Sequence, residues 1–165
     1  MIRTAETDVD LLIIKDIAHS TWPAAYGHII TADQMGYMLE MMYSLPSLKN
    51  QKDLLGHQFL IAENEQGQPI GFASYAAHGN EPNHFKLHKL YVLPDIQKKG
   101  TGKLLIERIV AQIKSTSPVV LELNVNRHNN AFHFYRKLGF DILREEDIDI
   151  GNGFFMNDYV LFKEV

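Results

Sequence analysis

The chain has 165 residues, of which 45% are hydrophobic and 22% are charged, as in an average soluble globular protein. This length fits one compact domain over residues 1–165. The formal net charge of -4 gives no overall attraction to nucleic acid. Without cysteine there is no disulfide, thiolate zinc site or cysteine nucleophile. No segment has the apolar length that a bilayer requires, so we expect a cytoplasmic protein with no membrane partner.

The first third of the chain predicts one strand followed by helices. Residues 2–5 favour a short strand, and the apolar residues between positions 11 and 18 recur at helical spacing. Pro23 is expected to break this helix, because proline cannot donate the backbone hydrogen bond that a helix needs. Thr31 is typical of a residue that caps a second helix, and Pro46 either ends that helix or starts another short turn.

The rest of the chain alternates between strand-like and helix-like segments, separated by turns rich in glycine, asparagine or proline. Strand-like segments cover residues 57–64, 69–77, 85–93, 119–125, 140–150 and 154–162, and helical spacing covers residues 101–115 and 129–138. This order predicts a mixed α/β fold that begins with helices and ends in a hairpin.

A glycine-rich turn separates the strand that ends near Val92 from the helix that begins at Thr101. Backbone N–H groups at a helix start are unpaired and carry the positive end of the helix dipole, and glycine lets a ligand approach them closely. Lysine side chains add positive charge at the same point. The turn therefore predicts a site for a phosphate-bearing ligand. Its residues are Gln97, Lys98, Lys99, Gly100, Thr101, Gly102 and Lys103.

Two other phosphate motifs fail at this turn. A Walker P-loop would need glycine in place of Gln97 and serine or threonine in place of Leu104. A dinucleotide-binding fingerprint would need a third glycine in place of Leu105. The remaining interpretations are a tight strand-to-helix turn without a ligand and a phosphate site of another kind.

Two segments resemble the signatures of the GNAT superfamily of N-acetyltransferases. The pattern Gln97-x-x-Gly100-x-Gly102 resembles the pyrophosphate loop of that family, and residues 90–94, Leu-Tyr-Val-Leu-Pro, resemble the strand that leads into it. Residues 129–140 resemble the second signature, Asn-x-x-Ala-x-x-Phe-Tyr-x-x-x-Gly-Phe. The resemblance covers residues 60–162, whereas residues 1–56 share only the pattern of strand and helices.

The resemblance implies an α/β fold with a central, mostly antiparallel, twisted sheet of about six or seven strands flanked by about four helices. In this family a bulge splays the strand before the loop from its neighbour at the CoA site. Acetyl-CoA is then the cosubstrate. By this resemblance the glycine turn binds its pyrophosphate, and the backbones of Leu90, Tyr91 and Val92 bind the thioester carbonyl and pantetheine. The family's asparagine falls at His128 in this spacing, so the contact is assigned to Asn129 on a loop one residue shorter.

The implied reaction is direct acetyl transfer from acetyl-CoA to a primary amine of a small molecule or peptide. An acyl-CoA-binding or sensing module without turnover is the alternative, and a structural dimer module that binds no CoA is the third interpretation. The resemblance and the C-terminal strands also point to a homodimer. Sequence alone does not separate peptide N-termini, lysine side chains, polyamines and aminoglycosides as acceptors.

Tyr135 is the predicted proton donor, because the family keeps a tyrosine at this position near the CoA sulfur and a phenol is protonated at neutral pH. A buried aromatic core residue is the competing interpretation. His88 is the predicted base, with Glu122 and Asn124 on the next strand as rivals and a surface histidine as the alternative. On an extended strand, Lys86, His88 and Leu90 would share one face.

The acceptor amine is expected between the N-terminal helices and the final hairpin. Trp22 and Tyr26, expected in a loop, together with Glu122 and Asn124, are the predicted acceptor-binding residues, although an aromatic stripe is more often core. The acidic run at residues 145–149 is either a solvated face or an attraction for a cation. Asn157 and Asp158 stand between apolar neighbours and suggest a polar contact. No metal is expected, since His84 and His88 would lie about 13 Å apart on an extended strand.

Overall fold

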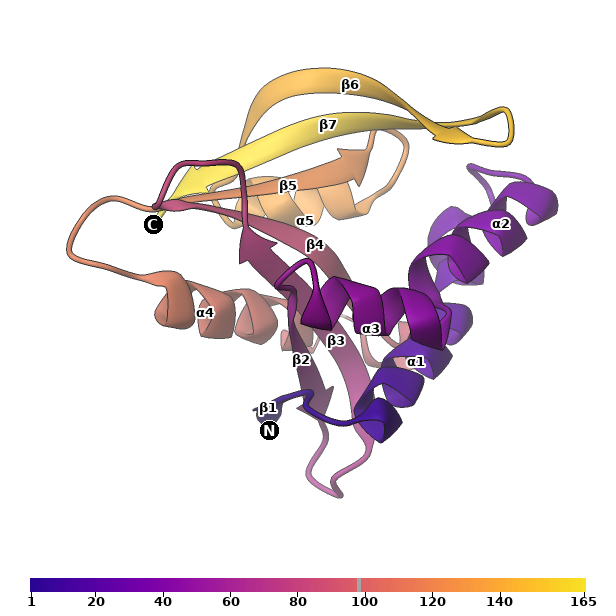
Figure 1. Cartoon of the computed structure of the whole chain (residues 1–165), viewed down its shortest axis with the longest axis horizontal. Helices are drawn as coiled ribbons and strands as arrows, with labels where there is room; N and C mark the ends of the chain where they lie inside the picture. The colour runs from indigo at the N-terminus through magenta and orange to yellow at the C-terminus, as the bar shows by residue number, and fades with distance from the viewer. Residues whose placement is uncertain (98) are drawn as a thin grey trace.

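The computed structural model describes residues 1–97 and 99–165 and shows one mixed α/β unit built on a seven-stranded sheet (Figure 1). The strands are β1 (Ile2–Thr4), β2 (Gln58–Glu63), β3 (Pro69–Ala77), β4 (His84–Val92), β5 (Val120–Asn126), β6 (Asp141–Gly151) and β7 (Phe154–Glu164). The helices are α1 (Asp8–Tyr26), α2 (Ala32–Tyr43), α3 (Leu45–Asp53), α4 (Thr101–Ile113) and α5 (Ala131–Lys137), with a 3₁₀ turn at Pro94–Ile96. The predicted fold class is confirmed.

The strand order is β1-β2-β3-β4-β5-β7-β6, and every pair is antiparallel except β4–β5. Strands β2, β3 and β4 form one half of the sheet, and β5, β7 and β6 diverge from it above (Figure 1). In the described residues, main-chain pairing therefore links the two halves at the parallel pair β4–β5 alone. None of the helices in the described ranges has the length and apolar character to cross a membrane.

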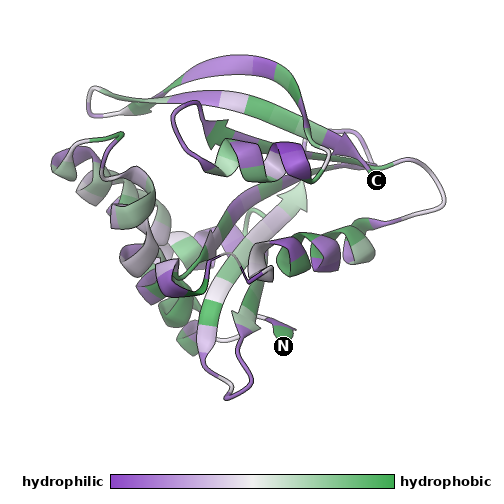
Figure 2. Cartoon of the chain, turned by 180° about the vertical axis from the view of Figure 1, so that it is seen from behind, coloured by the Kyte–Doolittle hydropathy of each residue, from purple (hydrophilic) through white to green (hydrophobic). Residues whose placement is uncertain are grey.

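Each face of the sheet carries its own apolar core. Leu105 and Ile109 of α4 pack on one face, and Leu11 and Trp22 of α1 pack on the other together with Tyr43 of α2. These side chains are almost fully buried, which stabilises the fold by about 1.5–3 kcal/mol for a typical apolar side chain. Apolar and polar residues alternate along the helices (Figure 2).

Helix α1 continues through Pro23 to Tyr26, so the prediction that Pro23 ends this helix was wrong. A capping box between Thr7 and Asp10 fixes the start of the helix. Pro23 removes only its own N–H, while its carbonyl still accepts a hydrogen bond from the N–H of Gly27 at 3.0 Å. Trp22 is 1% exposed and packs in the core. Tertiary packing thus outweighs the local effect of proline, and Trp22 and Tyr26 lie on a helix rather than in a loop.

Helix α3 is the one helix that the sequence indicated only as a short turn. It begins after Ser44, whose Oγ accepts a hydrogen bond from the backbone N–H of Ser47 at 3.4 Å, with Pro46 in the first turn. Proline is tolerated there because the first N–H groups of a helix have no internal partner. The described residues therefore form five α-helices where about four were expected.

Strand β4 contains one extra residue relative to β3. Ser74 pairs with Lys89 and Tyr75 with Leu87, so His88 is the bulged residue. Pairing with β5 ends at Leu87 and Leu123, although β4 continues to Val92 and β5 to Asn126. The expected bulge and splay are confirmed.

The bulge also changes which side chains share a face of β4. Leu90 packs against the core that contains α4. The ring of His88 instead stacks on that of His57, with ring centroids 4.0 Å apart. Lys89 points to Tyr43 and Phe59 of the other core. The prediction that Lys86, His88 and Leu90 share one face was therefore wrong, because it assumed an unbroken strand.

Helix α2 contacts the tip of the β6–β7 hairpin. The Tyr37 hydroxyl donates to the carbonyl oxygen of Ile150 at 2.9 Å, and Gln34 Nε2 donates to the carbonyl oxygen of Phe155 at 3.1 Å. The rings of Tyr37 and Phe154 lie 5.6 Å apart. These contacts join the N-terminal helices to the far end of the sheet.

Candidate functional site

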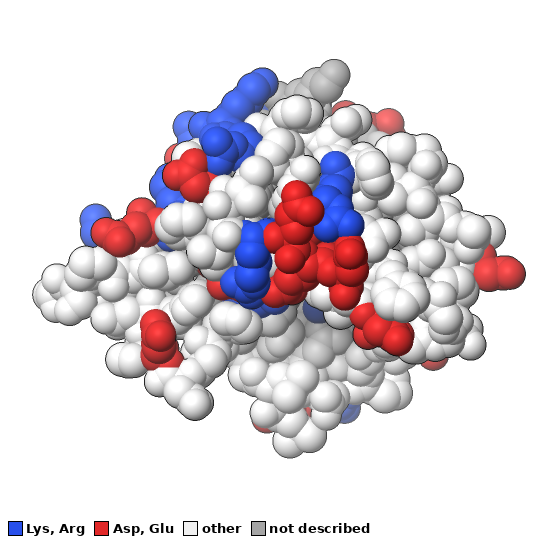
Figure 3. Space-filling model, turned by 90° about the horizontal axis from the view of Figure 1, so that it is seen from above, with Lys and Arg blue, Asp and Glu red and all other residues white. Residues whose placement is uncertain are grey.

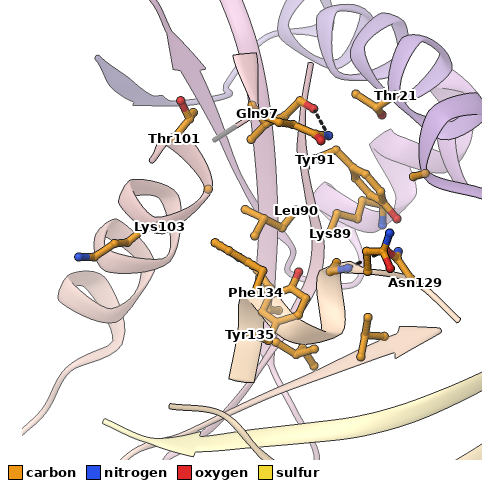
Figure 4. A pocket seen from close by; sticks show the side chains of 18 of the residues that line it. Thr21, Lys89, Leu90, Tyr91, Gln97, Thr101, Lys103, Asn129, Phe134 and Tyr135 are labelled. Atoms are coloured by element: carbon orange, nitrogen blue, oxygen red, sulfur yellow. Dashed lines mark hydrogen bonds between the residues drawn. The ribbon is translucent and has the colours of Figure 1, made fainter. Parts of the chain in front are cut away.

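A cavity of about 730 Å³ opens where β4 parts from β5 (Figure 4). Its walls come from the C-terminal part of α1, from β4 and β5, and from the starts of α4 and α5. This volume is typical of a small-molecule site. The cavity lies at the splay because main-chain pairing that would otherwise fill it ends at Leu87.

The β4 side of the cavity offers main-chain groups. In a strand, successive N–H groups point alternately to the two neighbours, and beyond Leu87 no pairing with β5 occurs in the described residues. Leu90, Tyr91 and Val92 line this wall. The N–H groups on this edge that point away from β3 therefore have no strand partner among the described residues, and the role predicted for Leu90, Tyr91 and Val92 stays a prediction.

The start of α4 forms a second wall. Gly100 caps the helix in the left-handed region with φ of 83° and without a side-chain cap hydrogen bond. A Cβ on Gly102 would lie 3.2 Å from Cζ of Phe134, so glycine lets α4 approach α5. Gln97 Nε2 donates to the carbonyl oxygen of Val92 at 3.1 Å, while Lys103 extends away from the other labelled side chains (Figure 4). The free donors and the dipole of this helix start suit an anion.

Tyrosine side chains from α1, β4 and α5 line the cavity. The hydroxyls of Tyr26 and Tyr91 lie 2.8 Å apart, and both residues line the cavity. Tyr135 on α5 also lines it and is 7% exposed. Burial, followed by the proximity of Tyr26, raises the pKa of Tyr135 above its ordinary value. Tyr135 therefore keeps its proton at neutral pH.

His88 lines the cavity and is exposed, yet protein atoms crowd its ring. This desolvation, followed by the neighbouring His57 and Lys89, lowers the pKa of His88 to about 2. Desolvation and Lys89 likewise lower the pKa of His57 to about 4. The stacked imidazoles are thus neutral at pH 7, and both are weak bases.

Lys89 is a buried cation beside this histidine pair. It is 6% exposed, and its Nζ donates to Oε1 of Gln51 at 2.6 Å. The ring centroids of Tyr43 and Phe59 lie 5.6 and 6.0 Å from Nζ. No carboxylate pairs with it among the described residues. Burial lowers the pKa of Lys89 to about 8.

The two rivals to His88 on β5 occupy different surroundings. Glu122 is buried away from the cavity, with its carboxylate 3.2 Å from Nε2 of His84 and 3.4 Å from Nη2 of Arg144. Asn124 lines the cavity, and its Nδ2 donates to Oδ2 of Asp158 at 3.2 Å. Burial raises the pKa of Asp158. The polar contact suggested for Asp158 is therefore present.

The exposed acidic run of β6 is largely paired. Acidic side chains lie between lysine and arginine side chains on the face seen in Figure 3. Arg127 contacts Asp147 at 2.5 Å, and Arg144 contacts Glu146 at 2.6 Å. These ion pairs reduce the negative electrostatic potential of residues 145–149, so the run is a solvated face of mixed charge.

The cavity brings together most of the predicted site residues. Those that line it are Tyr26, His88, Leu90, Tyr91, Val92, Gln97, Gly100, Thr101, Gly102, Lys103, Asn124, Asn129 and Tyr135. Trp22, Lys99 and Glu122 do not line it, and Lys98 lies outside the described residues. Trp22 instead supports Tyr26, with ring centroids 4.6 Å apart.

Some lining residues escaped the sequence prediction. Ala24 and Ala25 line the cavity because α1 continues past Pro23. Lys89 reaches the wall beside the bulge, which no local pattern indicated. Phe134 stood inside the second signature, and its contact with Gly102 could have been suspected there. Within the described residues no group of three or more His, Asp or Glu side chains is arranged to hold a metal ion.

Residues 56–142 match the family described as "Acetyltransferase (GNAT) domain". A 114-residue segment, 68% of the chain, is 31% identical to 70% of the [ribosomal protein bS18]-alanine N-acetyltransferase of Haemophilus influenzae. A 90-residue segment, 54% of the chain, is 29% identical to the peptidyl-lysine N-acetyltransferase YjaB of Escherichia coli and spans 53% of that protein, about half its length. The whole chain superposes on 99% of the PaiA N-acetyltransferase of Thermoplasma acidophilum, solved in complex with coenzyme A, with a TM-score of 0.79 and 25% identity.

Replacing Lys89 by methionine should stabilise the fold by about 1–3 kcal/mol at pH 7, because it removes a buried unpaired cation. The folded-state pKa of about 8 lies below the ordinary value of 10.5, so the unfolded chain holds the proton more tightly between these values. Stability of the unmodified protein therefore rises through this pH window, and the advantage of Lys89→Met shrinks. Urea unfolding at a series of pH values measures this, with the exposed Lys114→Met as control. A destabilised Lys89→Met protein at pH 7 would contradict the argument.

Proposed function

The chain belongs to the GNAT acetyltransferase family, and we propose on this basis that it transfers the acetyl group of acetyl-CoA to a primary amine. The observation that carries the proposal is the cavity between the splayed strands β4 and β5, which ends at the glycine-capped start of α4. The backbone hydrogen-bond donors on β4 suit a carbonyl group, and the start of α4 suits phosphate groups, so the cavity suits a ligand that carries both.

Each part of acetyl-CoA can be assigned to residues of this chain that would bind it. The N–H groups at Gly100, Thr101 and Gly102 would bind the pyrophosphate, with Gln97 and Lys103 beside it. For Lys98 and Lys99 this role stays a prediction from the sequence. Backbone N–H groups from Leu90 to Val92 would bind the thioester carbonyl and pantetheine. Asn129 lines the same cavity, and its Oδ1 accepts a hydrogen bond from the N–H of Ala131 at 2.9 Å, so it is held at the start of α5. Acetyl-CoA supplies the activated acetyl group.

In the reaction the amine nitrogen forms a bond to the acetyl carbon, the C–S bond breaks, one proton leaves nitrogen and one proton reaches sulfur. Tyr135 is proposed as the donor to sulfur. Its raised pKa makes it a weak acid, so it serves first as a hydrogen-bond donor and gives up the proton as negative charge develops on sulfur. Backbone donors on β4 would stabilise the charge on the carbonyl oxygen.

The amine proton needs an acceptor. Direct transfer to His88 is unfavourable, because a base with a pKa of about 2 competes poorly for a proton held by an alkylamine. We therefore propose that the neutral His88 imidazole orients a water molecule that takes the proton to solvent. Glu122 is engaged by His84 and Arg144, and it stays a rival.

The relatives act on a peptidyl lysine and on an alanine of a ribosomal protein. The feature common to these acceptors is an amine, and we extend only this feature to the present chain. Homodimerisation and a cytoplasmic location stay predictions from the sequence.

Acetyl-CoA turnover should be detected with a panel of peptide N-termini, lysine peptides, polyamines and aminoglycosides, by CoA-SH release and by mass spectrometry of the product. Gly102→Val should lower acetyl-CoA affinity about tenfold, because its side chain would enter the space of Phe134. Gly36→Val, on α2 with no described atom within 4 Å of an added Cβ, is the matched control. Acetyl-CoA binding without a product from any amine would favour the non-catalytic alternative.

Tyr135→Phe should reduce kcat about 100-fold and leave the dissociation constant of acetyl-CoA almost unchanged, because it removes the proton donor and keeps the ring. Tyr159→Phe is the control, since Tyr159 packs on Phe132 with ring centroids 5.1 Å apart and does not line the cavity. Steady-state kinetics and calorimetry give the two quantities. Full turnover in Tyr135→Phe would remove the assigned donor.

The pH profile tests the role of His88. With its pKa near 2, kcat/KM for an alkylamine should rise steadily from pH 6 to 9 as the amine loses its proton, without a break near 6.5. A break in the profile near pH 8 that disappears in Lys89→Met would be due to titration of Lys89. A break near 6.5 that disappears in His88→Gln would instead identify His88 as a direct base of ordinary pKa.

A further inference from the structure

The half-buried side chain of Asn124 lines the cavity and forms a polar pair with the buried side chain of Asp158 behind it. The strands β5 and β7 are antiparallel, with Asp158 opposite Asn126, which brings Asp158 diagonally across from Asn124 on the same face. Asp158 is 1% exposed, and its Oδ2 accepts from Nδ2 of Asn124 at 3.2 Å. A carboxylate only accepts hydrogen bonds, so this contact fixes the orientation of the Asn124 amide.

Each member of the pair has one oxygen left over. Asn124 Oδ1 and Asp158 Oδ1 are buried, and neither finds a donor among the described residues. Buried acceptors without a donor are rare and costly, and such atoms call for an explanation. Both of these oxygens accept hydrogen bonds, so a partner for them must be a hydrogen-bond donor.

The charge of Asp158 is also uncompensated at close range. No lysine, arginine or histidine in the described ranges forms an ion pair with it. Lys86 and Arg127 favour its ionised form from a greater distance, and Glu146 opposes it. Arg127 is already engaged by Glu145 and Asp147. A buried carboxylate in this setting favours a nearby cation.

Asn124 is the member of the pair that reaches the cavity. It directly follows Leu123, the last residue of β5 that pairs with β4, and it lines the cavity. Tyr26 also lines the cavity, and the charge of Asp158 adds to burial in raising the pKa of Tyr26. Asp158 therefore acts electrostatically on a second side chain of the cavity.

We propose that Asn124 and Asp158 form the subsite that binds the acceptor amine as its ammonium ion. Asn124 is the member that contacts the ammonium group, and Asp158 is a positioning residue that holds the amide and supplies the negative charge. The bound ammonium ion loses one proton to solvent through the water at His88 before attack, and the second proton leaves nitrogen as the amide forms. An ammonium group offers only donors and a positive charge, which is what this pair lacks. The inference rests on the proposed acetyl transfer and narrows its substrates to cationic amines in preference to neutral amines and hydroxyl compounds.

Asp158→Asn should separate a charge-selective subsite from a purely structural pair. The two acceptors to compare are benzylamine, a cation at pH 7, and aniline, which differs by one methylene and is neutral. We expect KM for benzylamine to rise about tenfold while the values for aniline and the dissociation constant of acetyl-CoA stay within about twofold. Glu164→Gln, an exposed site on the same strand, controls for the change in net charge. An equal effect on both amines, or no effect on either, would overturn the proposal.

Asn124→Leu provides an independent variant if Asp158→Asn does not fold. It should also reduce the preference for benzylamine, and Asp158→Asn should add little in its background, because Asp158 acts through Asn124. Fully additive effects would overturn this coupling.

Failure of the proposed acetyl transfer is recognised separately, as acetyl-CoA binding without transfer to any amine. In that case calorimetry of benzylamine with the protein–CoA complex decides the subsite. Binding that weakens about tenfold in Asp158→Asn supports it, and equal or absent binding in both proteins overturns it.

Discussion

One extra residue in β4 determines the shape of the site. His88 interrupts the register with β3, and one position earlier the pairing with β5 ends. From there the two central strands separate, so main-chain groups that would bond each other line a cavity. The same insertion turns Leu90 toward one core and Lys89 toward the other. The cavity and the placement of Leu90 and Lys89 on different faces thus coincide with a single local irregularity.

The cavity combines two kinds of surroundings. On one side, the start of α4 and the free edge of β4 present donors with no side chain required, which suits an anionic and carbonyl-bearing ligand. Elsewhere the cavity is lined by the neutral imidazole of His88 and by tyrosines with raised pKa, with the carboxylate of Asp158 behind Asn124. The two substrates of the proposed reaction would therefore meet different electrostatic surroundings.

Sequence patterns predicted the features that depend on short segments. The turn from Gln97 to Gly102 and the signature around Tyr135 located the cavity, because spacing alone places glycines at a helix start and a tyrosine on the next helix. The prediction for Pro23 was wrong, because burial of Trp22 against residues far along the chain outweighs the loss of one helical N–H at the proline. The Lys89 environment was inaccessible because it arises from a bulge. For Asp158 the sequence suggested a polar contact but not its partner Asn124, because that pairing depends on strand register. Contacts between distant segments have no signal in a single sequence.

The contact between α2 and the β6–β7 tip has a mechanical consequence. Within the described residues, main-chain pairing between the two halves of the sheet is limited to His84–Leu87 of β4 and its partners on β5. Tyr37 and Gln34 connect α2 to the far end of the sheet through hydrogen bonds to Ile150 and Phe155. These two peripheral hydrogen bonds therefore help the packed cores to set the angle between the halves, and with it the width of the cavity.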